Sequence, residues 1–116
     1  MSEFSKLMDF AKRTTALSQI SGLLGWDQET MMSKGSIEQR SEWMGHIEAT
    51  IHERRVSPRI GEWLSLIDAK DFSQTDIAQL RHIKRDYERS IKIPADFASS
   101  LAIITSRSQS IWAQAR

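Results

Sequence analysis

Residues 25–32 read Gly-Trp-Asp-Gln-Glu-Thr-Met-Met, and among the segments of the chain they hold the side chains best suited to binding or catalysis. The carboxylates of Asp27 and Glu29 could bind a substrate amine or a partner's arginine, and Trp26 could supply an apolar wall beside them. A simple connector usually needs only glycine, serine, asparagine or proline. We therefore expect this octet to interrupt a long helical pattern and to do more than join two helices.

A structural interpretation of the octet is also open, and we favour it. Trp26 would anchor the core between the first two helices. Asp27 would cap the next helical turn, and the negative charge of Glu29 would interact favourably with the positive N-terminal end of that turn. Acid–base catalysis by either carboxylate would require a shifted pKa and a defined geometry, which the sequence does not supply. We therefore predict no catalytic residue here.

Histidine is the other residue type with metal-binding chemistry, and the chain has His46, His52 and His82. His46 and His52 are six positions apart, about 240° around a helix, so they should point to different faces. His52 and Glu53 begin like the zinc motif His-Glu-x-x-His, but Val56 stands where the second histidine belongs. We interpret the histidines as surface or rim residues and predict no metal or cofactor site in this chain.

A basic strip is the next candidate, because four cations fall on one side of a single expected helix: Arg81, Arg85, Arg89 and Lys92. Such a strip could bind phosphates or the free carboxylate of a peptide. We favour a solvated face, since Glu88 lies four residues before Lys92 in the favourable orientation for a helical ion pair. The net charge of only +1 supports that interpretation.

Several segments, taken in order, resemble the carboxypeptidase Taq family of helical zinc metallocarboxypeptidases. They are residues 25–32, then Gly-Ser-Ile-Glu-Gln-Arg at 35–40, Ile-His-Glu-Arg at 51–54, Ile-Lys-Arg-Asp-Tyr-Glu-Arg at 83–89, and Ser-Ile-Trp-Ala-Gln-Ala-Arg at 110–116. The similarity covers nearly the whole chain. After Met32 the family usually has proline, whereas this chain has Ser33, so we expect a looser turn there.

The resemblance implies a complete enzyme that removes C-terminal residues from peptides, using zinc or a similar divalent metal and the glutamate of a His-Glu-x-x-His helix. That motif is absent from these 116 residues. We therefore expect an N-terminal helical part that is inactive alone, with no cofactor of its own. By resemblance only, six residues become candidates for the substrate groove: Trp26, Asp27, Gln28, Glu29, Arg85 and Tyr87. The implied partners are the remainder of the carboxypeptidase, a peptide substrate and a second copy.

Periodicity predicts an all-α fold of about five helices, an antiparallel bundle-like fragment of a larger helical enzyme. Prolines and glycines fall between the periodic segments. The expected helices are Ser2 to Gly22 or Leu24, Ser36 to Arg54 or Arg55, Pro58 to before Asp71, a fourth beginning after Ser73 or Thr75, and a fifth beginning at Pro94. Ser36 with Gln39 has the spacing of a capping box, and Ser57 should cap the third helix.

The fifth helix carries a narrow apolar stripe at coiled-coil spacing, formed by Phe97, Leu101, Ile104, Ser108, Ile111, Trp112 and Ala115. We expect this stripe, with Trp43 and Trp63, to lie on inner faces. No stop signal follows it, so we expect residues 1–116 to be one N-terminal domain truncated inside its last helix. Bare apolar surface would then drive the chain to dimers or higher oligomers.

The bulk properties narrow the partners further. The near-neutral charge gives no reason to expect nucleic acid, and no apolar run approaches the length of a membrane span. The absence of cysteine fits a reducing, cytoplasmic location. A different class of function stays open: a stand-alone helical interaction module without catalysis, whose last helix should finish with a cap and a polar surface.

Overall fold

The structure is a computed structural model that describes residues 2–116, and within that range it contains helices and no strand. The elements are α1 (Glu3–Thr30), a short 3₁₀ turn η1 (Lys34–Ser36), α2 (Ile37–Arg55), α3 (Pro58–Leu66), α4 (Gln74–Ser90) and α5 (Ala95–Ala115). The prediction of an all-α fold with about five helices is confirmed. In the same range, no helix combines the length and the hydropathy that crossing a membrane requires.

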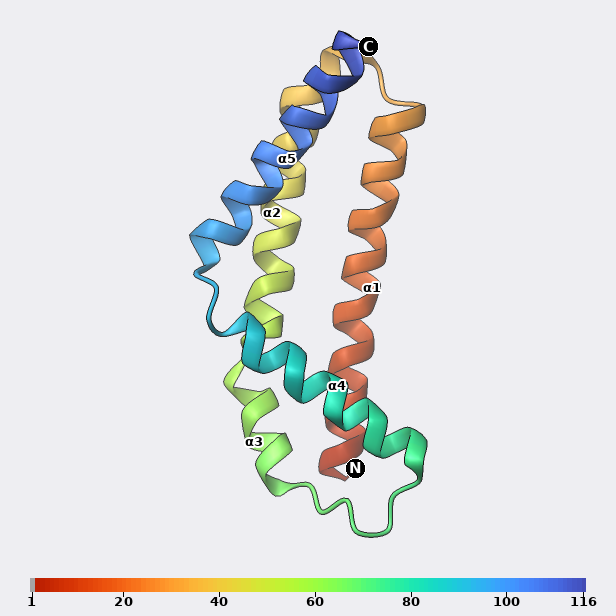
Figure 1. The fold of residues 1–116 in the computed structure, drawn as a ribbon, viewed down its shortest axis with the longest axis vertical. Helices are drawn as coiled ribbons and strands as arrows, with labels where there is room; N and C mark the ends of the chain where they lie inside the picture. Colours follow the sequence, from red (N-terminus) through yellow and green to blue (C-terminus); the bar gives the residue numbers. More distant parts are fainter. Residues whose placement is uncertain (1) are drawn as a thin grey trace.

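The three long helices run along the long axis of an elongated molecule (Figure 1). α1 and α2 are antiparallel, α5 returns alongside α2, and α3 and α4 gather at the end that holds the N-terminus. The extents are 55 × 25 × 23 Å, and the radius of gyration is 17.2 Å. A closed globule of this length would have a radius of gyration of about 13 Å. The chain therefore does not wrap around one central core.

Local capping sets two of the helix starts. Ser57 Oγ accepts a hydrogen bond from the N–H of Arg59 at 3.4 Å, with Pro58 in the first turn, as predicted. Ser73 Oγ accepts from the N–H of Asp76 at 3.2 Å. The capping box expected at Ser36 is wrong, because the 3₁₀ turn precedes α2 and the hydroxyl of Ser36 lies 2.9 Å from that of Ser33 instead.

Helix α1 is longer than predicted, since it ends at Thr30 and not near Gly22 or Leu24. Glycine in a helix interior is less favourable than alanine by about 1 kcal/mol. Gly22 and Gly25 nevertheless lie inside α1 without breaking it, and nothing lies within 4 Å of a Cβ at either position. The octet is therefore not a connector. Asp27 does not cap a following turn; its backbone carbonyl accepts from Met31 and Met32 at 2.9 and 2.8 Å and closes α1.

The best-packed apolar region lies at the α3–α4 end. The buried hydrophobic side chains of the described residues are Leu7, Ile51 and Ile60. Around them, Phe4 meets Phe72 edge-on at 4.8 Å between ring centroids, and Phe10 meets Trp63 at 5.5 Å. The expected inner position of Trp63 is confirmed. This end holds α1, α3 and α4 together and leaves the other end of the molecule to α1, α2 and α5.

Helices α2 and α5 approach closely through small residues. A Cβ atom at Gly45 would lie only 2.7 Å from Cγ1 of Ile103, so glycine is what admits that side chain. Ser99 Oγ donates to the carbonyl oxygen of Gly45 at 3.2 Å, and Ser41 Oγ donates to Ser106 Oγ at 3.1 Å. The face that α5 buries is therefore small and partly polar.

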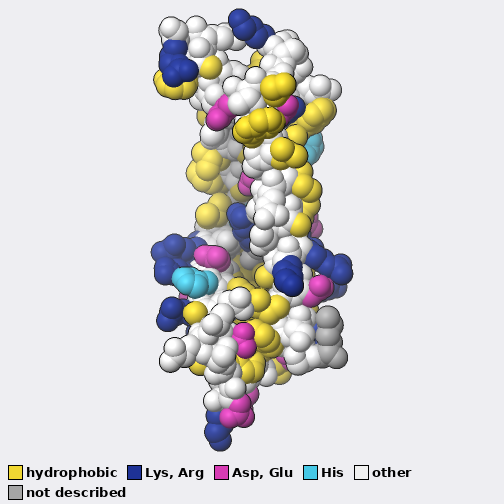
Figure 2. Space-filling model, turned by 90° about the vertical axis from the view of Figure 1, so that its right-hand side faces the viewer, with side chains coloured by type: hydrophobic (Ala, Val, Ile, Leu, Met, Phe, Trp, Pro, Cys, Tyr) yellow, Lys and Arg dark blue, Asp and Glu magenta, His cyan; other side chains and the backbone are white. Residues whose placement is uncertain are grey.

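The large apolar residues of α5 face the other way. We call Phe97, Leu101, Ile104, Ile111 and Trp112 the α5 stripe; their side chains are between 51% and 67% exposed. The predicted inner position of this stripe within the chain is wrong, because the small face occupies the contact with α2. Exposed hydrophobic side chains are not confined to α5, since Figure 2, which views the molecule from the α1 side, shows others on that face.

Candidate functional site

The octet residues lie on the last two turns of α1, where successive side chains are 100° apart and point in different directions. Asp27 reaches α2, Gln28 reaches α5, and Glu29 borders a cavity between these helices. Trp26 is 56% exposed and makes none of these contacts. The prediction of Trp26 as a core anchor between the first two helices is therefore wrong, because more than half of its surface stays open to solvent.

Asp27 forms an ion pair with Arg40, at 2.8 Å between Oδ2 and Nη2. Arg40 also donates from Nη1 to the carbonyl oxygen of Leu24 at 2.7 Å, and its guanidinium lies 5.4 Å from the ring of Trp43. The arginine is buried, and its Nε has no hydrogen-bond partner. Charge-assisted hydrogen bonds of this kind are strong, so Arg40 fixes the end of α1 on α2.

Gln28 ties α1 to α5 through a chain of hydrogen bonds. Its Nε2 donates to the carbonyl oxygen of Ser106 at 2.8 Å and to Oε1 of Gln109 at 3.2 Å. Its Oε1 accepts from Ser106 Oγ at 2.9 Å, and that hydroxyl accepts from Ser41 on α2. One buried serine therefore joins three helices, and both ends of the Gln28 amide are satisfied.

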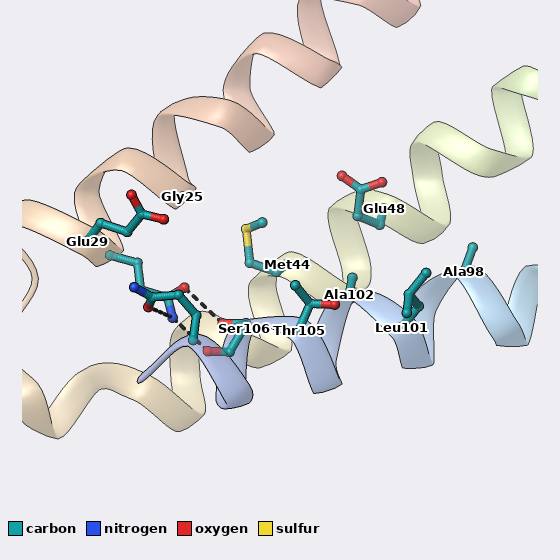
Figure 3. A pocket seen from close by; sticks show the side chains of 11 residues that line it. Gly25, Glu29, Met44, Glu48, Ala98, Leu101, Ala102, Thr105 and Ser106 are labelled. Carbon is teal, nitrogen blue, oxygen red and sulfur yellow. Dashed lines mark hydrogen bonds between the residues drawn. The ribbon is translucent and has the colours of Figure 1, made fainter. Parts of the chain in front are cut away.

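A cavity of about 340 Å³ opens beside this network, between α1 and α5 and over α2 (Figure 3). Its walls are formed by Gly25, Gln28, Glu29, Met44, Glu48, Ala98, Leu101, Ala102, Thr105, Ser106 and Gln109. Glu48 comes from α2 and accepts from Ser21 Oγ at 2.8 Å. The cavity combines small apolar walls with two carboxylates, a lining that suits an apolar group carrying a positive charge or an amide.

Arg85 and Tyr87 lie on α4, at the opposite end of the molecule from the octet (Figure 1). Arg85 is exposed, whereas Tyr87 is half-buried against α3, where its hydroxyl would lie 3.0 Å from a Cβ at Gly61. Tyr87 also borders a smaller hollow with Leu7 and Phe10 of α1. The structure therefore brings Gln28 and Glu29 together at one cavity and does not bring Arg85 or Tyr87 to it.

The histidines differ from the prediction in one respect. His46 and His82 are exposed, but His52 is buried, so its assignment to the surface is wrong. His46 and His52 border the same hollow, together with Glu53, although they were expected on different faces. Within residues 2–116, no three side chains of the donor types are grouped so that they could hold a metal ion. The donors present there do not fit a zinc site.

Two residues that tie the helices together around the cavity were not identified from the sequence as site residues. Arg40 was noted only as the last residue of the segment 35–40, and Ser106 was not singled out. Arg40 stands thirteen residues from its partner Asp27, and Ser106 stands 78 residues from Gln28. The available signal was a charged residue at an apolar position of a helix, which requires a buried partner.

Similarity to a known family, and not the contacts themselves, identifies the class of protein. The sequence profile of the carboxypeptidase Taq (M32) metallopeptidases matches residues 6–116, and the chain belongs to that family. The match includes the octet, Arg40 and the whole of α5. No solved structure matches the chain at a significant level.

Three curated relatives are carboxypeptidases. Thermostable carboxypeptidase 1 of Thermus thermophilus is 32% identical over 117 residues, which cover 97% of this chain and 23% of the relative. Carboxypeptidase 1 of Bacillus subtilis is 26% identical, covering 96% and 23%, and thermostable carboxypeptidase 1 of Pyrococcus furiosus is 28% identical, covering 90% and 21%. The chain thus spans less than a quarter of the length of these relatives.

Proposed function

We propose that this chain is the N-terminal helical part of a carboxypeptidase Taq-like metallocarboxypeptidase, in which it covers one side of the substrate groove. The observation that carries the proposal is the family match over residues 6–116, together with relatives more than four times as long as the matched stretch. The names of those relatives support removal of C-terminal residues from peptides as the activity of the complete enzyme.

The cavity between α1 and α5 is the part of this chain that we assign to the groove. Glu29 and Glu48 would face a positive group of the peptide, and the apolar wall near Met44 and Leu101 would receive an aliphatic side chain. Asp27 and Gln28 act indirectly, because their contacts with Arg40 and Ser106 hold the two walls at a fixed distance. Trp26, Arg85 and Tyr87 stay candidates for contacts with peptide or with the remainder of the enzyme.

The groups that break the peptide bond are proposed to lie outside this chain. A divalent metal, zinc or a similar ion, would supply Lewis-acid chemistry there. The residues of this chain contribute walls and packing surface, so the chain by itself is proposed to be inactive. We further propose that the enzyme is cytoplasmic, and that the chain by itself forms homo-oligomers because so much of its apolar surface is exposed.

Two assays test this proposal. The purified chain, incubated with zinc and blocked peptides, should release no C-terminal amino acid above the metal-free blank, with the Thermus relative as the active control. Release that depends on metal would contradict the proposal.

The second assay is a chimera in which this chain replaces the matching segment of the Thermus enzyme. It should keep carboxypeptidase activity, and Glu29→Gln should raise KM for peptides that carry a positive charge near the cleaved bond. If the chimera is inactive while the chain binds a separate folded partner, a helical interaction module becomes the better account.

A further inference from the structure

Among the described helices, α5 carries the most exposed large hydrophobic side chains, the five of the α5 stripe. Phe97, Leu101, Ile104 and Ile111 follow an alternating spacing of four and three residues in which Ser108 takes the position between the last two, and Trp112 stands beside Ile111. Such a seam matches a second helix lying nearly parallel, at a crossing angle of about 20°. The composition agrees, since Asp96 and Arg107 are the charged residues of the 21-residue helix. Arg107 is already paired with Glu38 of α2 at 2.8 Å.

The total surface indicates how large the missing contact is. The accessible surface is 8184 Å², whereas a closed monomer of 13.3 kDa would expose about 6,400 Å². The excess is more than the roughly 800 Å² that one partner contributes to a standard interface. A large, apolar contact of that kind is typical of an obligate interface and not of a transient one.

We propose that the α5 stripe is the seam along which the remainder of the carboxypeptidase packs, through an amphipathic helix whose apolar face complements Leu101, Ile104 and Ile111. This inference rests on the proposed function. The length of the relatives favours that occupant, because more than three-quarters of each lies outside the stretch that matches this chain. α5 is then a central helix, with α2 on its small face and the catalytic part on its large one.

The test compares one substitution in two settings. Ile104→Gln is introduced into the isolated chain and into the Thermus chimera, and Leu66→Gln serves as the matched control because Leu66, at the end of α3, is similarly exposed. In the chimera, Ile104→Gln should lower Tm by roughly 3 °C or more, since it buries an unpaired amide in a packed seam. In the dilute isolated chain it should change Tm no more than the control does.

The outcomes separate the two proposals. An active chimera whose Tm is indifferent to Ile104→Gln overturns the seam and leaves the proposed function intact. A chimera without activity counts against the proposed function.

A second measurement does not need the chimera to fold. A benzophenone amino acid at position 104 of this chain is co-expressed with the Thermus polypeptide that lacks the matching segment. Cross-links to that polypeptide, in excess over those from position 66, support the seam. Cross-links only to a second copy of the chain overturn it in favour of self-pairing.

Discussion

Helices α4 and α5 both lie on the outside of the molecule, yet their sequences suit different surroundings. α4 has seven charged residues among 17, and α5 has two among 21. Among the described residues, α4 has no buried side chain and α5 has one, Ser106. Similar exposure with opposite composition agrees with our proposal that α4 faces solvent, whereas α5 is an interior helix of the complete enzyme. Composition therefore says more than exposure about where a helix finally lies.

The two helices also orient their apolar residues in opposite ways. α4 turns Leu80, Ile83 and Tyr87 toward the molecule and leaves its cations in solvent. α5 turns Ser106 and Ile103 inward and leaves its largest apolar residues outside. Four substitution experiments can break or sharpen this comparison.

The largest effect is expected on association of the isolated chain. Leu101→Lys combined with Ile104→Lys places charges in the seam and should weaken self-association at least about a hundredfold, or about 2.7 kcal/mol. Sedimentation equilibrium measures it, and Leu66→Lys should have little effect. A wild-type chain that stays monomeric at high concentration would contradict the exposed seam.

The second-largest effect is expected on folding stability, from a larger side chain placed against the small face of α5. Gly45→Val forces Ile103 off the surface of α2 and should destabilise the chain by about 2 kcal/mol. Gly22→Val is the control, because nothing lies within 4 Å of a Cβ there, and its effect should be near zero. Urea denaturation compares the two, and equal midpoints would exclude close α2–α5 packing.

The tie between α1 and α5 should contribute less. Gln28→Ala leaves the hydroxyl and carbonyl oxygen of Ser106 without their amide partner and should cost about 1 kcal/mol. Gln19→Ala, on the exposed side of α1, should stay within about 0.5 kcal/mol. Indistinguishable urea midpoints for both variants would show that the network does not hold the helices together.

The smallest effect is expected on α4. Arg85→Gln removes an exposed charge and should change the free energy of unfolding by less than about 0.5 kcal/mol. Thermal and urea unfolding should both report it. A decrease in the free energy of unfolding well above about 1 kcal/mol would contradict the interpretation of α4 as a solvent-facing helix.

Local signals made part of the fold predictable. Ser57 with Pro58 marks the start of α3 because a cap needs only residues adjacent in sequence. The predicted capping box at the start of α2 was wrong, since Lys34–Ser36 forms a 3₁₀ turn that the capping pattern does not reveal. The predicted end of α1 near Gly22 or Leu24 was also wrong. The last turns are held by long-range contacts at Asp27 and Gln28, which the local sequence does not reveal.

The site was less accessible than the fold. The octet was recognised as chemically unusual, and Gln28 and Glu29 do border the cavity. Ser106, the partner of Gln28, and Glu48, which also lines the cavity, come from other helices, as does Arg40, the partner of Asp27. No spacing in the sequence encodes those distances. The periodicity of the sequence revealed the stripe of α5. The direction in which the stripe points depends on Gly45 of α2, because its missing side chain lets the opposite, smaller face of α5 pack closely there.

Hydroxyl-radical footprinting, read by mass spectrometry, tests the central claim most directly. The oxidation rates of Leu101, Ile104 and Trp112 are measured in the dilute chain and in the Thermus chimera, with Ile77 on α4 as an internal reference. The account predicts rapid oxidation of the α5 residues in the isolated chain and at least about fivefold protection in the chimera, with Ile77 little changed. Equal oxidation of the α5 residues in both proteins would contradict the claim that α5 is an interior helix.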